Sequence, residues 1–367
     1  MRVLREIVSE TSIKVAFSPA CNFRCEYCGG GRGRKGSPYP AAMEDYRATS
    51  LKSGRMLNTD EMTNCLRALA TAGFKRIRPT GGEPTLNPEW DLLVERANEI
   101  GFSVDITTNG SRLNSYLDKK KKLPNGLSMV KVGLDTPDPI RYHEVNGGRG
   151  DLKDVERAIV RVLGLGMYVR LNTVLTRSGC GVETLKNMME YSESLGVQQV
   201  QLLDLVYYPN YPSNDPEVLQ NNKSYWENQF VSFNEFRKIF RQAYPNGNFS
   251  STPGQFGVDF WKTTLPSGLV VTFKDSTSTM RDEKCFKCPV FCQEGRCLLR
   301  LGTDGNLTPC PDYRSELPDN FNVLDSVRDA TFNKKINVLV DSLVNSKKTR
   351  TIEMFARVHG LKLPEKV

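Results

Sequence analysis

Cys21-Asn22-Phe23-Arg24-Cys25-Glu26-Tyr27-Cys28 is the stretch that decides the fold of this chain, because it sets three cysteines in a C-x3-C-x2-C spacing. Three thiolates this close can hold three irons of a four-iron cluster and leave the fourth iron without a protein ligand. A structural zinc site would need a fourth cysteine or histidine nearby, and none follows within the next twenty residues. The stretch therefore predicts a 4Fe–4S cluster whose open iron can bind a small molecule.

Outward from this stretch, short apolar runs alternate with amphipathic stretches from residue 13 to about residue 204. The expected strands are Ile13–Phe17, Lys75–Arg78, Ser103–Thr107, Met129–Leu134, Met167–Val174 and Val200–Leu203. The expected helices between them are Asp60–Ala72, Glu89–Ile100, Leu152–Leu165 and Glu183–Leu195. This βαβα rhythm predicts an α/β fold, a partial (β/α)6 TIM-type barrel. Ligands bind at the C-terminal ends of such strands, which is where the cysteine stretch begins.

The composition of the sequence changes after the barrel, and three domains are expected. Residues 1–231 would form the partial barrel, ending in a loop over 205–231. Residues 232–321 would form a small cysteine-rich auxiliary-cluster domain. Residues 322–367 would be a C-terminal helical segment, with its helix over Asn322–Asn345.

Composition narrows the class of protein. The net charge is +8, and the 367 residues include ten cysteines but only two histidines. The first residues, Met1–Glu10, are charged and lack an apolar core, so no signal peptide is expected, and no apolar run is long enough for a membrane span. Ten cysteines without a secretion signal indicate a reducing, cytoplasmic location. The run Lys119–Lys122 is interpreted as a solvated helix end, so neither a nucleic-acid nor a membrane partner is expected.

A second short stretch, Thr80-Gly81-Gly82-Glu83-Pro84, follows the second expected strand. Its glycines let the backbone approach a ligand closely, and its carboxylate suits a bound ammonium group. Taken alone, these residues are better explained as a capped turn between a strand and a helix. Together with the cysteine stretch one βα unit earlier, they resemble the signature of the radical SAM enzymes.

The resemblance implies that the open iron binds S-adenosylmethionine (AdoMet), whose one-electron cleavage gives methionine and a 5′-deoxyadenosyl radical. A reductant such as flavodoxin or ferredoxin would supply the electron, and Cys21, Cys25 and Cys28 would hold the cluster. The later residues that match the family are weak evidence one by one, because a turn or a buried polar residue would explain each of them. Their order along the chain supports the resemblance. The other residues expected to bind the cofactor are Tyr27, Asn109 and Asp135 at its nucleoside end, Gly81, Gly82 and Glu83 at its methionine, and Thr108 and Asn172.

Five further cysteines gather toward the C-terminus: Cys285, Cys288, Cys292, Cys297 and Cys310. Their spacing alone is compatible with a structural zinc knuckle. In a chain that resembles radical SAM enzymes, a second 4Fe–4S cluster of the twitch or SPASM type is favoured, with Cys285, Cys288 and Cys310 foremost among its ligands. Such a cluster would bind substrate if it kept an open iron, or accept an electron if four cysteines held it.

Much of the chain resembles the GTP 3′,8-cyclase family of molybdenum-cofactor synthesis, from Ile13 to about Asp204 and again over Arg296–Cys310. The resemblance implies hydrogen abstraction from an anionic, nucleotide-like substrate and its rearrangement or cyclisation. It also implies that four basic residues around the barrel mouth hold this substrate: Lys14, Arg78, Arg170 and Arg300. Other positions depart from the family, because two arginines, a methionine and a serine are replaced by Gln201, Leu298, Val206 and Gly133.

Two other classes of protein stay open. Pro84-Thr85-Leu86-Asn87-Pro88 is equally familiar from peptide-modifying radical SAM enzymes, which usually carry a leader-binding module. About a dozen residues precede the first expected strand, which argues against such a module at the N-terminus, and the four basic residues favour a small anionic substrate. A non-catalytic iron–sulfur or zinc protein would need neither the open three-cysteine site nor the Gly81-Gly82-Glu83 segment.

Overall fold

The chain is seen here as a computed structural model, which describes a defined part of the sequence. The described residues are 8, 11–28, 56–207, 216–252, 259–276, 280–281, 285, 288, 290–292, 299–309, 320–345, 348–349 and 352–363. Two of the predicted metal ligands, Cys297 and Cys310, lie outside these residues, as does Leu298.

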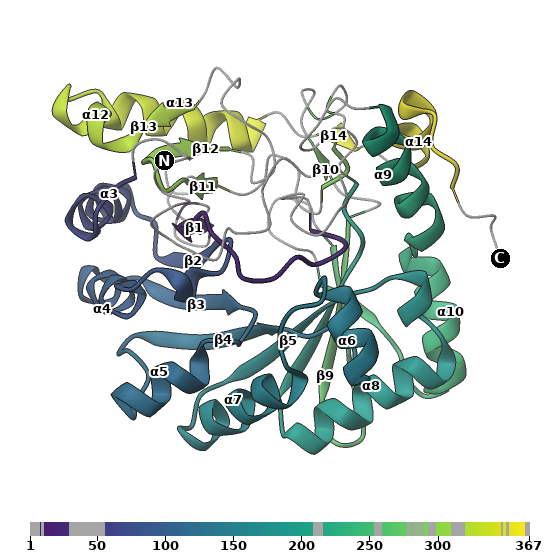
Figure 1. Cartoon of the computed structure of the whole chain (residues 1–367). Helices are drawn as coiled ribbons and strands as arrows, with labels where there is room; N and C mark the ends of the chain where they lie inside the picture. Colours follow the sequence, from purple (N-terminus) through teal and green to yellow (C-terminus); the bar gives the residue numbers. More distant parts are fainter. Residues whose placement is uncertain are drawn as a thin grey trace.

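Parallel strands alternating with helices build the first half of the fold (Figure 1). The strands are β1 (Ser12–Ser18), β2 (Arg76–Gly81), β3 (Ser103–Thr108), β4 (Leu127–Gly133), β5 (Val169–Val174) and β6 (Gln199–Leu203). The helices between them are α3 (Thr59–Thr71), α4 (Trp90–Ile100), α5 (Leu113–Lys120), α6 (Pro139–Val145), α7 (Leu152–Gly164) and α8 (Val182–Leu195). All six predicted strands and all four predicted helices are confirmed, with bounds that differ by a few residues, while α5 and α6 were not predicted.

The second half of the chain supplies both edges of the same sheet, which runs in the order β13-β12-β11-β1-β2-β3-β4-β5-β6-β9-β8-β7. Strand β9 (Val270–Asp275) lies parallel to β6, and β11 (Leu299–Leu301) lies parallel to β1. The remaining edge strands are antiparallel: β7 (Ser250–Thr252), β8 (Asp259–Thr264), β12 (Asn306–Thr308) and β13 (Phe321–Asn322). Among the described ladders β6 pairs with β9 rather than with β1, so the sheet is curved but open, as in a partial barrel.

The two faces of the sheet differ in chemistry because side chains alternate along each strand. In β5, Val169 and Leu171 are buried in the main hydrophobic core, which also holds apolar residues of α3, α4, α7 and α8. Arg170 and Asn172 alternate with them and point to the opposite face. Figure 1 shows the helices along the outer, convex side of the curved sheet. The outer face therefore carries the apolar core, and the inner face is polar.

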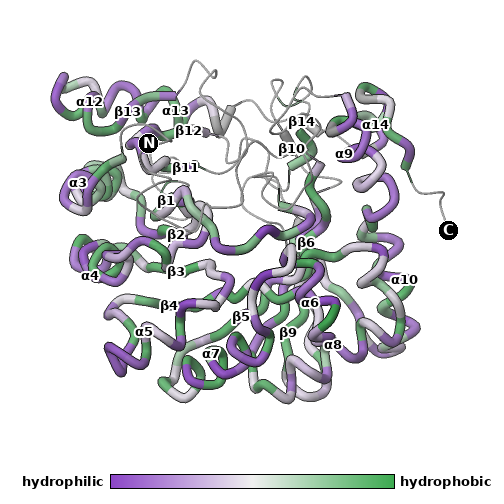
Figure 2. The backbone as a smooth tube through the Cα atoms, viewed as in Figure 1, coloured by the Kyte–Doolittle hydropathy of each residue, from purple (hydrophilic) through white to green (hydrophobic). Residues whose placement is uncertain are grey.

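Local signals in the sequence set the helix ends. Asn58 accepts a hydrogen bond from the backbone N–H of Glu61, and Glu61 accepts one from the backbone N–H of Asn58, so the capping box before α3 is present. Gly101 and Gly196 end α4 and α8 in the left-handed conformation that favours glycine. Figure 2 shows hydrophobic and hydrophilic segments interleaved along α7 and α8, as expected of helices with one buried face.

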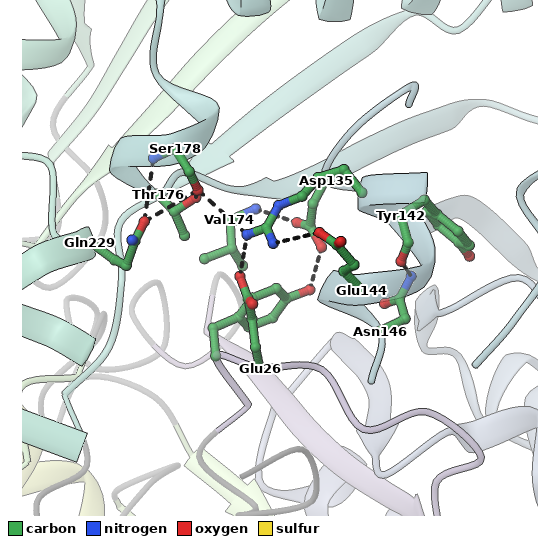
Figure 3. Close-up of polar contacts among 11 residues, drawn as sticks. Glu26, Asp135, Tyr142, Glu144, Asn146, Val174, Thr176, Ser178 and Gln229 are labelled. Atoms are coloured by element: carbon green, nitrogen blue, oxygen red, sulfur yellow. Dashed lines mark hydrogen bonds and ion pairs between the residues drawn. The ribbon is translucent and has the colours of Figure 1, made fainter. Parts of the chain in front are cut away.

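The prediction of a loop over residues 205–231 was wrong for its second half. Helix α9 (Pro216–Gln229) occupies it, and it is anchored by Trp226, which is fully buried and stacks on Phe230 with ring centroids 4.5 Å apart. The indole N–H of Trp226 also donates to the backbone oxygen of Leu205 at 3.1 Å. The many Asn and Gln residues of this stretch suggested a loop, but two aromatic anchors one helical turn apart outweigh them. Figure 3 shows Gln229, at the end of α9, directed at Ser178.

The single helix predicted over Asn322–Asn345 is two helices, α12 (Val323–Arg328) and α13 (Phe332–Asn345). Ala330 between them takes a φ of 54°, a left-handed conformation that no α-helix continues through. Three more helical or strand elements close the described chain: α14 (Ile352–His359) and the pair β10 (Met280–Arg281) and β14 (Lys348–Thr349). Helix α10 (Phe233–Ala243) packs beside α8.

The predicted domain boundaries fall within continuous structure. Strand β9, from the segment 232–321, hydrogen-bonds to β6, with β8 and β7 following it in the sheet, and β13 spans the boundary between residues 321 and 322. The division into 1–231, 232–321 and 322–367 stays a prediction. Among the described residues, no helix has the length and apolar character needed to cross a membrane.

Candidate functional site

The cysteine stretch follows β1 and is held against the end of α6. The backbone N–H of Arg24 donates to the oxygen of Asn146 at 3.1 Å, and that of Glu26 donates to the oxygen of Val145 at 2.8 Å. Adding a Cβ at Gly147 would place it 2.5 Å from the backbone oxygen of Arg24, so only glycine allows this approach. A short helix that the sequence did not predict therefore positions the cysteines.

The three thiols of this stretch are half-buried on one loop. The Cys25 thiol donates to the side-chain oxygen of Asn146 at 3.2 Å. Burial raises the pKa of Cys25 well above its ordinary value, and the charges of Cys28, Asp135 and Cys21 raise it further. Close thiolates therefore repel one another and require a cationic partner.

These cysteines fit an iron–sulfur cluster by the nature of their donors. In the described part of the chain, no three metal-ligating side chains converge as in an assembled metal centre. Three neighbouring thiols are the donor set of a 4Fe–4S cluster with an open iron. Cys21, Cys25 and Cys28 would hold this cluster, as the spacing predicts.

Tyr27, between the second and third cysteines, reaches across to the end of β4. Its hydroxyl donates to Asp135 Oδ2 at 2.6 Å, and Asp135 Oδ1 accepts from the backbone N–H of Val174 at 2.7 Å (Figure 3). Burial raises the pKa of Asp135 to about 6, while the hydrogen bonds from Tyr27 and Val174 oppose the rise. Beside them, Arg141 donates to Glu26 at 2.7 Å. The ends of β4 and β5 are thus tied to the cysteine stretch.

Gly81 and Gly82 run against the backbone that leads into the cysteine stretch. The N–H of Gly82 donates to the oxygen of Ser18, and that of Glu83 donates to the oxygen of Ala20, both at 2.7 Å. A Cβ would lie 2.2 Å from the Ser18 oxygen at Gly81 and 1.8 Å from the Ala20 oxygen at Gly82. Gly81 also takes a φ of +123°, which L side chains rarely adopt. Both glycines are required by the structure itself, whatever they bind.

Substituting Gly82→Ala should lower the free energy of unfolding by about 3 kcal/mol or more, because the new Cβ collides with backbone atoms that cannot rotate away. Gly164→Ala, at the end of α7, is the matched control, since nothing lies within 4 Å of its Cβ position. The control should be neutral or stabilising by up to about 1 kcal/mol. Urea unfolding of the two variants measures this difference, and equal stabilities would contradict the close approach.

The carboxylate of Glu83 is buried and accepts hydrogen bonds from neighbouring residues of the protein. Its Oε1 accepts from the hydroxyl of Thr108 at 2.6 Å and the backbone N–H of Thr85 at 3.1 Å. Its Oε2 accepts from the backbone N–H of Asn109 at 2.7 Å. Burial raises the pKa of Glu83, and these hydrogen bonds oppose the rise. Glu83 therefore joins the ends of β2 and β3, and its contact with a bound ammonium stays a prediction.

Asn109 connects this carboxylate to the cysteine stretch. Its amide nitrogen donates to Asn22 Oδ1 at 2.9 Å, and Asn22 in turn donates to the hydroxyl of Ser111 at 2.8 Å. The Ser111 hydroxyl closes the ring by donating to Asn109 Oδ1 at 2.7 Å. Sequence reasoning missed Asn22 and Ser111, although Asn22 lies between the first two cysteines and so lay within the motif.

A row of basic residues crosses the inner face of the sheet. Lys14 pairs in register with Arg78 on one side and with Arg300 on the other, and Arg170 pairs with Lys131. The four predicted substrate residues thus share one face, on β11, β1, β2 and β5. We call the set of five the cationic row: Lys14, Arg78, Lys131, Arg170 and Arg300.

Lys131 and its partner Asp105 were missed by sequence reasoning. Lys131 Nζ lies 2.7 Å from Asp105 Oδ2, and the lysine side chain is 2% exposed. The available signal was a lysine between two valines, Val130 and Val132, in the middle of an expected strand. Among the other predicted residues, Asn172 lies on the inner face and accepts from the side chain of Arg170 at 3.0 Å.

The second cysteine group is described in part. Cys285 and Cys292 are buried and Cys288 is half-buried, while its remaining members lie outside the described residues. Phe291 and Tyr207 exchange backbone hydrogen bonds of 3.0 Å, which brings this segment beside the chain that leaves β6. The described part of the group therefore reaches the same end of the sheet as the cysteine stretch. Its metal stays a prediction.

Comparison with known proteins agrees with this geometry. The radical SAM superfamily matches residues 15–192, a span that contains the three-cysteine stretch and the Gly81-Gly82-Glu83 segment. The chain contains a radical SAM domain. This family implies a 4Fe–4S cluster and AdoMet.

Curated relatives of this chain are similar over about half of their length. A probable GTP 3′,8-cyclase of Methanococcus maripaludis (strain C6) is 27% identical over 186 residues, which cover 50% of this chain and 56% of that protein. A GTP 3′,8-cyclase of Staphylococcus aureus (strain JH9) is 27% identical over 197 residues, which cover 53% of this chain and 54% of that protein.

A solved structure shares the fold over most of the chain. The crystal structure of Streptococcus suis SuiB bound to S-adenosylmethionine superposes with a TM-score of 0.50 at 14% identity, covering 89% of this chain and 65% of that one. SuiB bound to its precursor peptide SuiA gives the same TM-score of 0.50 at 15% identity, with coverage of 90% and 67%. At these identities the likeness shows the fold alone.

Asp204 lies where the chain leaves β6, and its carboxylate is fully buried. Its Oδ2 accepts hydrogen bonds from the backbone N–H of Ser276, at 2.9 Å, and from the hydroxyl of the same residue. Burial raises the pKa of Asp204 to about 7, and the charge of Asp275 adds to this rise against the Ser276 hydrogen bonds. A carboxyl of this kind carries its proton in the folded state well above the pH at which the unfolded chain loses it.

Asp204→Asn should therefore flatten the pH dependence of stability. The folded-state pKa is about 7 against an ordinary 3.8, so wild-type stability falls as pH rises from about 4 to about 7. The asparagine variant lacks this contribution, and the difference between the two proteins should be greatest above pH 7. Urea unfolding at several pH values measures the slopes, with surface Asp118→Asn as the control that keeps the wild-type slope. Parallel slopes for wild type and Asp204→Asn would refute the assignment.

Proposed function

We propose that this chain is a radical SAM enzyme that cleaves AdoMet reductively and abstracts hydrogen from an anionic, nucleotide-like small molecule, which then rearranges or cyclises. The observation that carries the proposal is the cationic row on the inner face of the sheet, on the same strands that lead to the cysteine stretch. The GTP 3′,8-cyclase names of the curated relatives support the same substrate class.

The residues at the strand ends would bind the cofactor. The cluster and AdoMet, when bound, would supply a 5′-deoxyadenosyl radical after one electron arrives from a donor such as flavodoxin or ferredoxin, in a cytoplasmic setting. The backbone of Gly81 and Gly82, which carries no side chain of its own, would lie along the methionine. Tyr27, held by Asp135, would lie beside the adenine, and Asn109 would orient the nucleoside end.

The depth of the inner face suits an elongated substrate. Lys14 lies four residues before Ser18 on β1, and strands rise about 3.3 Å per residue, so Lys14 lies about 13 Å below the end of its strand. A molecule with its anionic groups on the row would extend its other end toward the cysteine stretch. Hydrogen abstraction needs the reacting atoms about 3–3.5 Å apart, which such two-ended binding would enforce.

A second cluster is part of the proposal. Cys285, Cys288 and Cys292, with Cys297 and Cys310, would hold it near the chain that leaves β6. Peptide modification is the second candidate function, favoured by the segment Pro84-Thr85-Leu86-Asn87-Pro88 beside the cofactor site, where η1 (Pro84–Leu86) is buried against β1 and β3.

Anaerobic reconstitution followed by iron, sulfide and zinc counts tests both cluster assignments. About eight irons per chain are expected for two 4Fe–4S clusters. Cys25→Ala should lose about four irons and all AdoMet binding, since it removes one of three ligands. Cys180→Ala is the matched control, because this buried thiol lies outside both cysteine groups. About four irons with one zinc would assign the second group to a structural role.

Product chromatography with dithionite and AdoMet tests the reaction class and the substrate. Formation of 5′-deoxyadenosine should require Cys25 and should rise when GTP or another nucleoside triphosphate is added. Arg170→Met should raise the KM for that nucleotide by tenfold or more while AdoMet cleavage without substrate continues. If nucleotides leave the rate unchanged and peptides raise it, the peptide-modifying class replaces this proposal.

A further inference from the structure

The pair of Lys131 and Asp105 is the part of the inner face that neither motif nor comparison explains. Lys131 on β4 is 2% exposed, and its ammonium lies 2.7 Å from the carboxylate of Asp105 on β3. The Asp105 side chain is 28% exposed, so it is more accessible to solvent than the side chain of Lys131. The inference drawn from this pair rests on the proposed function and specifies the substrate group that the inner face binds.

Two arginines surround the same carboxylate. Arg170 is the register partner of Lys131, and Arg78 follows the pair Ile77 and Val104, which places it beside Asp105 across β2 and β3. The Nε of Arg78 is buried and has no hydrogen-bond partner within the described residues. Three cations therefore gather around one acidic group.

These groups act on one another through their charges. Burial lowers the pKa of Lys131 well below its ordinary value, and the charges of Arg78 and Arg170 lower it further, against Asp105. Burial and the charge of Arg78 likewise lower the pKa of Arg170 to about 10. Buried cations in excess of their counter-charges are costly, and an anion that enters among them removes this cost.

We propose that Lys131, Arg78 and Arg170 form a subsite for a phosphate group of the substrate, and that Asp105 holds Lys131 in place until the phosphate takes over. Arginine presents a planar set of donors that matches phosphate oxygens, and lysine adds a point charge. The unpaired Nε of Arg78 supplies a donor for this contact. Asp105 competes with the incoming anion, so it sets how much negative charge the anion must carry to bind.

Inorganic pyrophosphate is the probe, and calorimetry on the reconstituted full-length chain without AdoMet measures its Kd at fixed ionic strength. Lys131→Met should weaken binding at least tenfold, because it removes one contact and leaves Asp105 to repel the anion. Lys153→Met on the outer helix α7 makes the same substitution at an exposed lysine and should leave the Kd unchanged. Asp105→Asn should tighten binding about tenfold, because the competing charge is gone.

The opposite directions of the two variants separate binding from folding, since a misfolded chain would not bind pyrophosphate more tightly. Wild-type affinity in Lys131→Met, or unchanged affinity in Asp105→Asn, would overturn the subsite. These results are independent of turnover. If pyrophosphate binds as described but no nucleotide supports product formation, the phosphate subsite stands and the proposed function fails. If nucleotides are turned over while Lys131→Met binds pyrophosphate like wild type, the reverse holds.

Discussion

Two backbone hydrogen bonds, from Gly82 to Ser18 and from Glu83 to Ala20, join the segment after β2 to the segment that leads into the cysteine stretch. The rest of the site depends on them, because they fix where the first cysteine leaves the sheet. The approach is so close that a Cβ at Gly82 would lie 1.8 Å from the Ala20 oxygen. The glycines of this segment are thus explained by packing before any ligand is considered, and ligand contact is a second consequence of the same bare backbone.

Polar side chains then extend this attachment to the neighbouring strands. Glu83 draws donors from β3 and the turn after it, and Asn109 passes the connection back to Asn22 within the cysteine stretch. Asp135 does the same for β4 and β5 through Tyr27 and Val174. Each buried carboxylate is stabilised by two or more hydrogen bonds, which is the condition under which such groups are tolerated in a protein interior. The strand ends are therefore fixed relative to one another before any cofactor is bound.

The sequence was sufficient to predict the six parallel strands, their helices and the cysteine stretch, because alternation and cysteine spacing are local signals. Residues whose role depends on partners far along the chain were less predictable. Lys131 lies between two valines, and nothing local shows that Asp105, on the preceding strand, meets its ammonium. Helix α9 was missed for the same reason, since Trp226 becomes an anchor only when it is buried by distant aromatic residues such as Phe291.

The two faces of the sheet have different roles, and this difference explains how the fold tolerates its cationic row. The outer face buries the aliphatic side chains of every parallel strand beneath the helices and supplies most of the hydrophobic stabilisation. The inner face can then carry groups that cost stability. Arginine is the cation that bears partial burial best, because its guanidinium is weakly hydrated and stays charged. Lysine loses more, so the single fully buried lysine of the row is also the one with a carboxylate at 2.7 Å. Asp105 thus offsets part of the cost of burying an ammonium at this depth.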